Sequence, residues 1–352
     1  MHGSSGLRGA LRRFILVGTA VLALGVGGAP AVAQDEAGFQ AYINGPLRAE
    51  ALRAGVSART LDAVLPGLTF NPRVVELDRD QPGGGSTGPI PNFAPYKARH
   101  VDAARINRGR ETYRRLRAKL ERVERETGVP ESIMVAIFGH ETNYGSYTGN
   151  FDLPRSLATL AYEGRRRTLF AGEFIATMKM IDRGVPRDSL KGSWAGAFGY
   201  PQFLPSVYLR LGRDGDGDGV ANIWSNEADT LASIANYFVE AGWRPGQPWG
   251  VAVTVPAGLN RAALANRTVP TRCKRVFERH SQWRSMAEWR ALGIVPQSGN
   301  WPADHIQATL LEPDGPGKTA YLLTGNYRVI LDYNCSNFYA LSVGLLADEV
   351  EH

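Results

Sequence analysis

The chain has little cysteine, and it has no long apolar run beyond its N-terminal segment. Neither Cys273 nor Cys335 has the close cysteine or histidine neighbours of a zinc site, which argues against zinc. No later segment approaches the ~20 apolar residues that a membrane-spanning helix needs. A basic tail and nucleic-acid motifs are also absent from the sequence, so we expect no DNA or RNA partner.

The apolar N-terminal segment has the features of a secretory signal peptide. Arginines precede an apolar stretch over residues 14–26, and small residues at 31–33 form an A-x-A cleavage site. We therefore expect residues 1–33 to be removed, leaving a soluble exported chain that begins near Gln34. A lipid anchor would need a cysteine just after the apolar stretch, and none is there, so no membrane anchor is expected.

Export also bears on the cysteines and on the charge. In an oxidising compartment Cys273 and Cys335 most simply form one disulfide, and a pair of buried free thiols is the alternative. The formal net charge of +6 includes the arginines of the signal peptide, so the mature chain is only mildly basic. Its dispersed arginines indicate a weak preference for anionic surfaces.

Hydrophobic periodicity divides the chain into regions that are mostly helical. We expect an N-terminal helical region over 34–125 with a Gly/Pro-rich linker at 81–91, a central region over 126–244, and a C-terminal α/β part over 245–352. The predicted helices are two short ones on either side of Gly55, then 102–127, 130–145, 166–181, 229–240 and 338–350. The predicted strands are 251–255, 320–323 and 327–331. The expected fold class is mainly α (α+β).

Glu141 is the most informative residue, because it lies near the end of the otherwise apolar helix predicted at 130–145. At 100° per residue it shares a helix face with Met134, Ile137 and Phe138. Burial there would raise the pKa of its carboxyl group, as a general acid at neutral pH requires. The alternative is a glutamate at a helix end that faces solvent or pairs with an arginine.

Two catalytic motifs are matched only in part. His140-Glu141 begins like the zinc-binding H-E-x-x-H signature, but Tyr144 replaces the second histidine, so a zinc peptidase is not expected. Residues 84–88 match the letters of the serine-hydrolase elbow, yet they lie in the linker, without the preceding strand and following helix that this motif needs.

The segment from Asp214 resembles a calcium-binding EF-hand loop. Asp214, Asp216 and Asp218 occupy loop positions one, three and five, and the Val220 carbonyl occupies position seven. Position twelve is Ser225 instead of the usual glutamate, so Glu227 or Asp229 would have to supply that ligand. We predict a structural calcium ion here, and a solvated acidic turn is the alternative.

Aromatic side chains are frequent over residues 190–245, where they either fill a core or line a sugar-binding cleft together with amides such as Gln202. Several segments there and elsewhere, taken together, resemble the B-type lytic murein transglycosylases, glycoside hydrolase family 103. The matching segments are 139–145, 157–160 with Arg165 and Arg166, 190–206, 222–224, 235–238, 325–327 and 333–340. They agree in order, spacing and residue type over nearly all of the mature chain.

The resemblance implies a lysozyme-like core over 126–244 that acts on peptidoglycan in the periplasm, with the C-terminal part completing the cleft and no organic cofactor. It places the family's single catalytic glutamate at Glu141. The implied substrate-binding residues are Tyr96, Arg165, Arg166, Ser193, Gln202, Tyr237, Tyr333, Asn334 and Tyr339. The implied calcium ligands are Asp214, Asp216, Asp218, Val220 and Asp229.

The chain departs from the family pattern at His140, where a small aliphatic residue is usual, and at Ser225, often an aspartate. The first change could shift the pKa of Glu141, and the second affects calcium binding. The family cleaves the bond between N-acetylmuramic acid and N-acetylglucosamine without water, leaving a 1,6-anhydro end. Two alternatives stay open, a muramidase that uses water and a non-catalytic, calcium-stabilised wall-binding protein.

Overall fold

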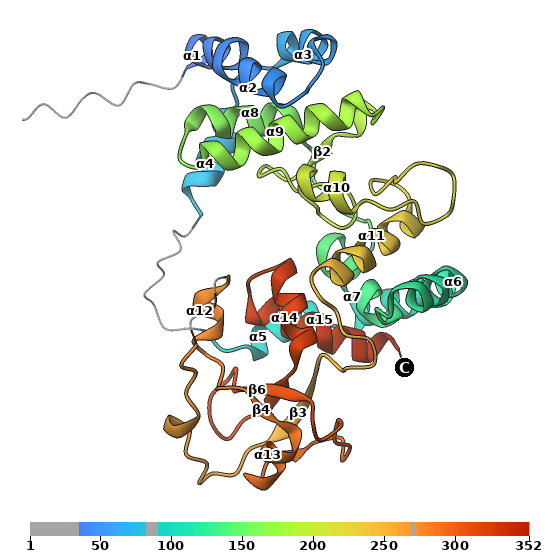
Figure 1. The fold of residues 1–352 in the computed structure, drawn as a ribbon, viewed down its shortest axis with the longest axis vertical. Helices are drawn as coiled ribbons and strands as arrows, with labels where there is room; N and C mark the ends of the chain where they lie inside the picture. Colours follow the sequence, from blue (N-terminus) through green and yellow to red (C-terminus); the bar gives the residue numbers. More distant parts are fainter. Residues whose placement is uncertain (1–34, 82–90, 269, 271, 352) are drawn as a thin grey trace, which may run out of the picture. The chain divides into compact units, whose positions relative to one another are not determined.

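A computed structural model describes residues 35–81, 91–268, 270 and 272–351 (Figure 1). The predicted signal peptide and nearly all of the predicted linker lie outside these residues. Within them the chain is mainly helical with small sheets, as predicted. None of the helices in the described ranges is long and apolar enough to cross a membrane.

The N-terminal segment folds into short helices that pack on the helix pair α8 and α9. Its elements are α1 (Glu36–Tyr42), the π-helical turn η1 (Ile43–Leu47), α2 (Arg48–Arg53), α3 (Ala58–Val64), the 3-10 turn η2 (Leu65–Gly67) and α4 (Pro72–Arg79). The predicted turn at Gly55 is confirmed, and its φ of +89° suits glycine. Phe39 of α1 and Phe174 of α9 are fully buried in the cluster that joins these helices.

Helices from distant parts of the chain form the central core. They are α5 (Ala94–His100), α6 (Ala103–Thr127), α7 (Glu131–Thr142), α11 (Glu227–Glu240), α14 (Gly325–Tyr333) and α15 (Asn337–Val350). Helices α8 (Leu153–Glu163) and α9 (Arg167–Asp182) share the cluster of the N-terminal helices, and α10 (Pro205–Leu211) packs on α9. The predictions for α6, α7, α9, α11 and α15 are confirmed apart from the exact ends. Pro130 caps α7 from outside the helix, and the helix ends at Thr142, before Gly145.

Helices α6 and α7 approach closely around a single tyrosine. Tyr144 follows α7 and donates a hydrogen bond to the Arg105 carbonyl of α6 at 3.0 Å. Both helices carry glycine at this point, because a Cβ on Gly139 or on Gly109 would lie 2.5 Å from an atom of the Tyr144 side chain. The two glycines thus provide the space that the tyrosine ring occupies.

The C-terminal part contains a five-stranded antiparallel sheet in the order β4-β6-β7-β3-β5. Its strands are β3 (Gly250–Thr254), β4 (Arg284–Ser285), β5 (Val295–Pro296), β6 (Gln307–Leu311) and β7 (Ala320–Leu323), and a second sheet pairs β1 (Phe151–Asp152) with β2 (Lys191–Gly192). The short helices here and nearby are η3 (Arg187–Ser189), η4 (Ala262–Leu264), α12 (Lys274–Phe277) and α13 (Met286–Ala291). The predicted strands 251–255 and 320–323 are confirmed as β3 and β7.

The predicted strand 327–331 is wrong, because these residues lie in helix α14. The Thr324 side chain accepts a hydrogen bond from the Asn326 amide at 3.1 Å and caps the helix. Tyr327, Ile330 and Leu331, at helical spacing, are fully buried. The β-branched composition that favoured a strand is outweighed by this helical burial.

Helix α8 was not predicted, although the sequence carries its signals. The Asp152 side chain accepts a hydrogen bond from the Arg155 amide at 2.9 Å, and Pro154 occupies the first turn. Gly164 ends the helix in the left-handed conformation with a φ of +96°.

The predicted disulfide is confirmed. Cys273 and Cys335 are bonded with a Cα–Cα distance of 5.3 Å and close a loop of sequence separation 62. Cys335 lies between α14 and α15, so the bond ties the junction of these two helices to the start of α12.

Replacing both cysteines should destabilise the fold mainly by relaxing the unfolded chain. For a loop of this size we expect the Cys273→Ser/Cys335→Ser variant to lose roughly 4 kcal/mol of unfolding free energy, measured by urea denaturation. The oxidised protein treated with a reductant is the matched control and should unfold at the same urea concentration as the variant. An unchanged midpoint in both samples would contradict the prediction.

Candidate active site

Helix α7 is buried along nearly its whole length, and this burial limits the access of water to Glu141 near its end. Met134, Ile137 and Phe138, the predicted neighbours of Glu141 on the helix face, are fully buried. Helices α6, α11 and α15 pack around α7. A carboxyl group at the end of such a helix has protein atoms where water would otherwise solvate it.

The chain leaves α7 through consecutive residues in the left-handed region. Asn143, Tyr144 and Gly145 have φ values of 50°, 59° and 81°. Thr142 holds this turn, since its hydroxyl accepts a hydrogen bond from the Gly145 amide and donates one to the Tyr200 carbonyl, both at 3.1 Å. The tight exit fixes the last turn of the helix, where Glu141 lies.

Glu141 combines a buried carboxyl group with one strong hydrogen bond. The residue is half-buried, and the Tyr339 hydroxyl of α15 donates to Glu141 Oε1 at 2.5 Å. Desolvation raises the pKa of Glu141 to about 7, and the Tyr339 hydrogen bond opposes part of that rise. About half of the Glu141 side chains are therefore protonated at neutral pH.

The pKa of Glu141 shows no influence of a second carboxylate from the part of the chain that the structure describes. Among the residues of the described ranges, no other carboxylate acts on the pKa of Glu141, which responds to burial and to Tyr339 alone. This arrangement differs from glycosidases that need a second carboxylate as nucleophile or base about 5–9.5 Å away.

An aromatic wall leads to Glu141 from α5. The rings of Tyr96 and His100 stack with centroids 3.8 Å apart, and His100 stacks on His140 at 5.9 Å. The His140 ring then contacts Tyr339 at 5.5 Å. Tyr96 is within electrostatic range of Glu141, so the structure brings this predicted residue to the site.

His140 adds no charge beside Glu141. Burial lowers the pKa of His140 to about 3, and the nearby Arg105 guanidinium also disfavours its protonated form. The ring is therefore neutral at pH 7. His140 therefore contributes no charge to the pKa shift of Glu141, whose causes are burial and the Tyr339 hydrogen bond, and a change of this pKa by His140 stays a prediction.

Tyr333 and Tyr237 form the other side of the site. Their rings lie 4.8 Å apart, and the negative charge of Glu141 acts on Tyr333 and raises its pKa, in addition to burial. The Tyr333 hydroxyl donates to the Pro201 carbonyl at 2.5 Å, and Tyr237 donates to the Asp332 carbonyl at 2.8 Å. Both phenol groups are thus fixed by backbone acceptors.

Three more predicted residues lie on segments that adjoin these tyrosines. Gln202 has a φ of 51° and donates to the carbonyls of Thr148 and Gly199. Ser193 accepts a hydrogen bond from the Ala197 amide, and Asn334 is exposed next to Tyr333.

Arg165 and Arg166 make their contacts elsewhere. Both arginines form ion pairs with Asp78 of α4, which is 1% exposed, and Arg165 Nε donates to Asp78 Oδ2 at 2.9 Å. Their guanidinium groups are thus engaged in joining α4 to the turn between α8 and α9. Among the described residues, no hydrogen bond, ion pair or cation–π contact connects either arginine with the group around Glu141.

The acidic loop gathers the predicted carboxylates. Asp214, Asp216 and Asp218 each offer an oxygen within 4.8 Å of the others, and all are exposed. Asp214 also accepts hydrogen bonds from the amides of Gly217 and Gly219, which lower its pKa. Three carboxylates at this separation repel one another and suit a cation that prefers oxygen ligands.

Asp229 closes the loop from α11. Its two carboxylate oxygens accept from the amides of Gly215 and Asn222, both at 2.7 Å, and the residue is fully buried. Ser225 is hydrogen-bonded to the Asn222 side chain, and Arg122 of α6 donates to the Gly215 carbonyl. Here Asp229 organises the backbone of the loop and does not join the three aspartates as a fourth neighbour.

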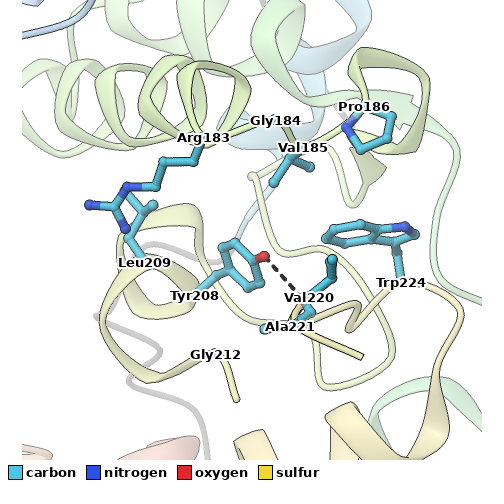
Figure 2. A pocket seen from close by; sticks show the side chains of 11 residues that line it. Arg183, Gly184, Val185, Pro186, Tyr208, Leu209, Gly212, Val220, Ala221 and Trp224 are labelled. Atoms are coloured by element: carbon cyan, nitrogen blue, oxygen red, sulfur yellow. Dashed lines mark hydrogen bonds between the residues drawn. The ribbon is translucent and has the colours of Figure 1, made fainter. Parts of the chain in front are cut away.

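A cavity of about 280 Å³ lies beside the acidic loop (Figure 2). Figure 2 shows Tyr208, Val220 and Trp224 around it, with the Tyr208 hydroxyl donating to the Ala221 carbonyl at 3.0 Å. None of the residues grouped around Glu141 lines this cavity, so it is separate from the candidate active site.

Sequence reasoning missed two residues that shape the site. His100 completes the aromatic wall, and its position one helical turn after Tyr96 was a signal that could have suggested stacking. Tyr144 was noted only as the residue that breaks a zinc motif, whereas it fills the space between α6 and α7.

Known proteins match the chain over most of its length. The transglycosylase SLT domain matches residues 38–348. Membrane-bound lytic murein transglycosylase B of Escherichia coli K12 is 32% identical over 270 residues, which are 75% of this chain and 69% of that protein.

Solved structures agree with this match. SltB3 of Pseudomonas aeruginosa, in complex with NAG-anhNAM-pentapeptide, is 38% identical with a TM-score of 0.79, over 89% of this chain and 79% of that one. Slt35 of Escherichia coli, in complex with calcium, is 28% identical with a TM-score of 0.71, over 90% and 93%. The chain therefore belongs to the family of lytic transglycosylases that carry the transglycosylase SLT domain.

Proposed function

We propose that the protein cleaves the β-1,4 bond between N-acetylmuramic acid and N-acetylglucosamine in peptidoglycan and leaves 1,6-anhydromuramic ends. The observation that carries this proposal is Glu141, a carboxyl group with a pKa near 7 and no second carboxylate acting on it. Hydrolysis by the usual two-carboxylate route lacks its partner group here. A nucleophile that belongs to the substrate removes that need.

Glu141 performs both proton transfers in this mechanism. Protonated Glu141 gives its proton to the glycosidic oxygen as the bond from that oxygen to muramic C1 breaks. The muramic O6 hydroxyl then attacks C1 and transfers its proton to the Glu141 carboxylate. The carboxyl group returns to its starting state, and no water is consumed.

Tyr339 holds the carboxyl group in place between the two steps. Its hydroxyl donates to Oε1, which leaves Oε2 free to exchange the proton with substrate. The hydrogen bond stabilises the carboxylate formed after the first transfer and so moderates the effect of burial.

The substrate-binding surface is proposed to comprise the polar and aromatic groups around Glu141. They are Tyr96, Ser193, Gln202, Tyr237, Tyr333, Asn334 and Tyr339. Because the SltB3 structures hold disaccharides with a pentapeptide, we propose that this protein also accepts glycan strands that carry stem peptides. Arg165 and Arg166 would contact substrate only by sharing or leaving their ion pairs with Asp78.

We further propose a periplasmic location and a division of labour along the chain. Residues 1–33 would direct export, and the disulfide would form in the oxidising compartment. Residues 34–125 would form an N-terminal helical region, residues 126–244 the catalytic core, and residues 245–352 an α/β part that completes the cleft.

Calcium is proposed as a structural ligand of the acidic loop. Asp214, Asp216 and Asp218 would hold the ion, together with the Val220 carbonyl, and the Slt35 structure with calcium supports this assignment by similarity. Ser225 supplies no bidentate carboxylate at position twelve, so we expect weaker binding than in a complete EF-hand loop. Asp229 would act through the loop backbone that it already holds.

Glu141→Gln should abolish turnover while leaving wall binding intact, because the amide keeps the shape but cannot donate the proton. We expect a loss of at least a thousandfold in kcat, measured as anhydromuropeptides released from purified cell wall by mass spectrometry. Glu131→Gln, at the other end of α7, is the matched control and should retain activity. Reducing muramic ends from the wild type would identify a hydrolase, and full activity of Glu141→Gln would remove Glu141 from its role.

The alkaline limb of the pH profile should report the pKa of Glu141. Protonated Glu141 is the acid, so kcat/KM should fall as pH rises through about 7. Tyr339→Phe removes a hydrogen bond that lowers this pKa, and the limb should therefore move to higher pH. Tyr144→Phe controls for the loss of a phenol group away from Glu141. A limb that stays in place or moves to lower pH in Tyr339→Phe would contradict the assignment.

Removing calcium should destabilise the loop through repulsion among its aspartates. We expect a chelator to lower the Tm by several degrees and added calcium to restore it, with magnesium less effective. In Asp214→Asn/Asp218→Asn the Tm should no longer respond to either treatment. A wild-type Tm that is indifferent to chelator and calcium would exclude the site.

A further inference from the structure

A cavity of about 500 Å³ lies beside α14, and none of the residues grouped around Glu141 lines it. Helix α14 contributes Arg328 and Asp332, the segment after α11 contributes Arg244, and Trp283 and Gln307 come from the C-terminal part. A second cavity, of about 340 Å³, continues past Trp283, Arg328 and Asp332 toward Phe277. The two cavities share these walls.

Arg328 is held in this cavity by aromatic rings. Its guanidinium carbon lies 3.4 Å from the ring centroid of Phe277 and 4.9 Å from that of Trp283. No carboxylate of the described residues lies within salt-bridge distance of Arg328, and burial lowers its pKa to about 9, so it stays charged at neutral pH. Asp332 acts on Arg328 electrostatically and raises its pKa, but it is paired with Arg272, so the desolvated Arg328 guanidinium has hydrogen-bond donors to offer an anion.

The charge of the cavity is positive. Arg244 also lacks a carboxylate partner among the described residues, and its guanidinium group lies beside Gly325 at the start of α14. The acidic residue of the lining, Asp332, is paired with Arg272 at 3.4 Å. Trp283 is 40% exposed and offers a ring face to an apolar part of a ligand.

The cavity is connected to the proposed cleft through α14. The Asp332 carbonyl accepts the Tyr237 hydrogen bond, and Tyr333, which faces Glu141, is the next residue. Arg328 lies five residues before Tyr333, about 7.5 Å along the helix axis. A stem peptide, which spans about 3.3 Å per residue when extended, is long enough to cover this axial separation.

We propose that this cavity, between Arg328, Arg244 and Trp283, binds a free carboxylate of the stem peptide carried by the glycan strand. The inference rests on the proposed function. In a peptide-bearing strand the lactyl carboxyl group of each muramic unit is amide-bonded to the stem peptide, so the free carboxylates of peptidoglycan are those of its peptides. A guanidinium fork matches a carboxylate in a bidentate manner, and the Trp283 face suits the aliphatic part of an amino acid.

The test compares two substrates, glycan strands with intact stem peptides and the same strands after enzymatic removal of the peptides. Removal hydrolyses the amide bond to the sugar and leaves a lactyl carboxylate on each muramic unit, so the second substrate keeps a carboxylate on the ring but none at the position of the stem peptide. For Trp283→Ala and for Arg244→Gln we expect KM to rise about tenfold on the peptide-bearing strands, with kcat within twofold of wild type. KM on the bare strands should not change. Arg328→Lys, which keeps the charge but loses the planar fork, should show the same split.

The chain offers a matched control pair. Arg290 lies over the Trp301 ring at 5.0 Å, but its guanidinium group is paired with Asp304 at 2.6 Å. Arg290→Gln and Trp301→Ala should leave KM unchanged on both substrates. Equal changes of KM on both substrates in the cavity variants, or no change on either, would overturn the proposal.

Direct binding separates this inference from the proposed reaction. A free stem tripeptide should bind the full-length Glu141→Gln protein, and the same peptide with its carboxylates amidated should bind at least tenfold more weakly, measured by calorimetry. Inorganic phosphate that competed as well as the tripeptide would overturn the assignment to a carboxylate. If the wild type released no anhydro product while the tripeptide still bound, the proposed function would fail and the cavity assignment would stand.

Discussion

The burial of one helix end is the constraint on which the site depends. Helix α7 is apolar from Ile133 to Gly139 and packs against α6, α11 and α15, and Glu141 follows in its last turn. The desolvation that stabilises the protonated carboxyl group is thus a by-product of the same packing that builds the core. A more polar α7 would weaken the core and lower the pKa of Glu141, so that less of its carboxyl group would be protonated at neutral pH.

Helix α11 connects two parts of the molecule that have different chemistry. Asp229, in its first turn, fixes the backbone of the acidic loop, and Tyr237, two turns later, contacts Tyr333 in the proposed cleft. Because Asp229 and Tyr237 lie on the same helix, the conformation of the acidic loop affects the position of Tyr237 in the proposed cleft. The same helix packs on α6, whose arginines Arg115 and Arg122 contact Glu227 and the loop.

The features of the fold and of the site that the sequence predicted correctly are mostly those encoded by a local pattern of residues. Helix α7 and the raised pKa of Glu141 follow from a single apolar run, and the disulfide followed from two cysteines in an exported chain. The approach of Tyr333 and Tyr339 to Glu141 needed the family resemblance, because α14 and α15 lie far along the chain. The strand predicted at 327–331 failed because short β-branched runs do not distinguish a strand from a buried helix. The contacts of Arg165 and Arg166 with Asp78 join segments that no local pattern relates.

The meeting of Gly109, Gly139 and Tyr144 has a consequence for how this sequence can change over time. A side chain at either glycine would collide with the tyrosine ring, so neither position can be altered first while Tyr144 remains. Loss of the tyrosine would leave a void between α6 and α7 and free the Arg105 carbonyl. The three positions are therefore mutually dependent: an evolutionary path that changes one of them passes through a less stable intermediate, and we expect them to be exchanged together or kept together.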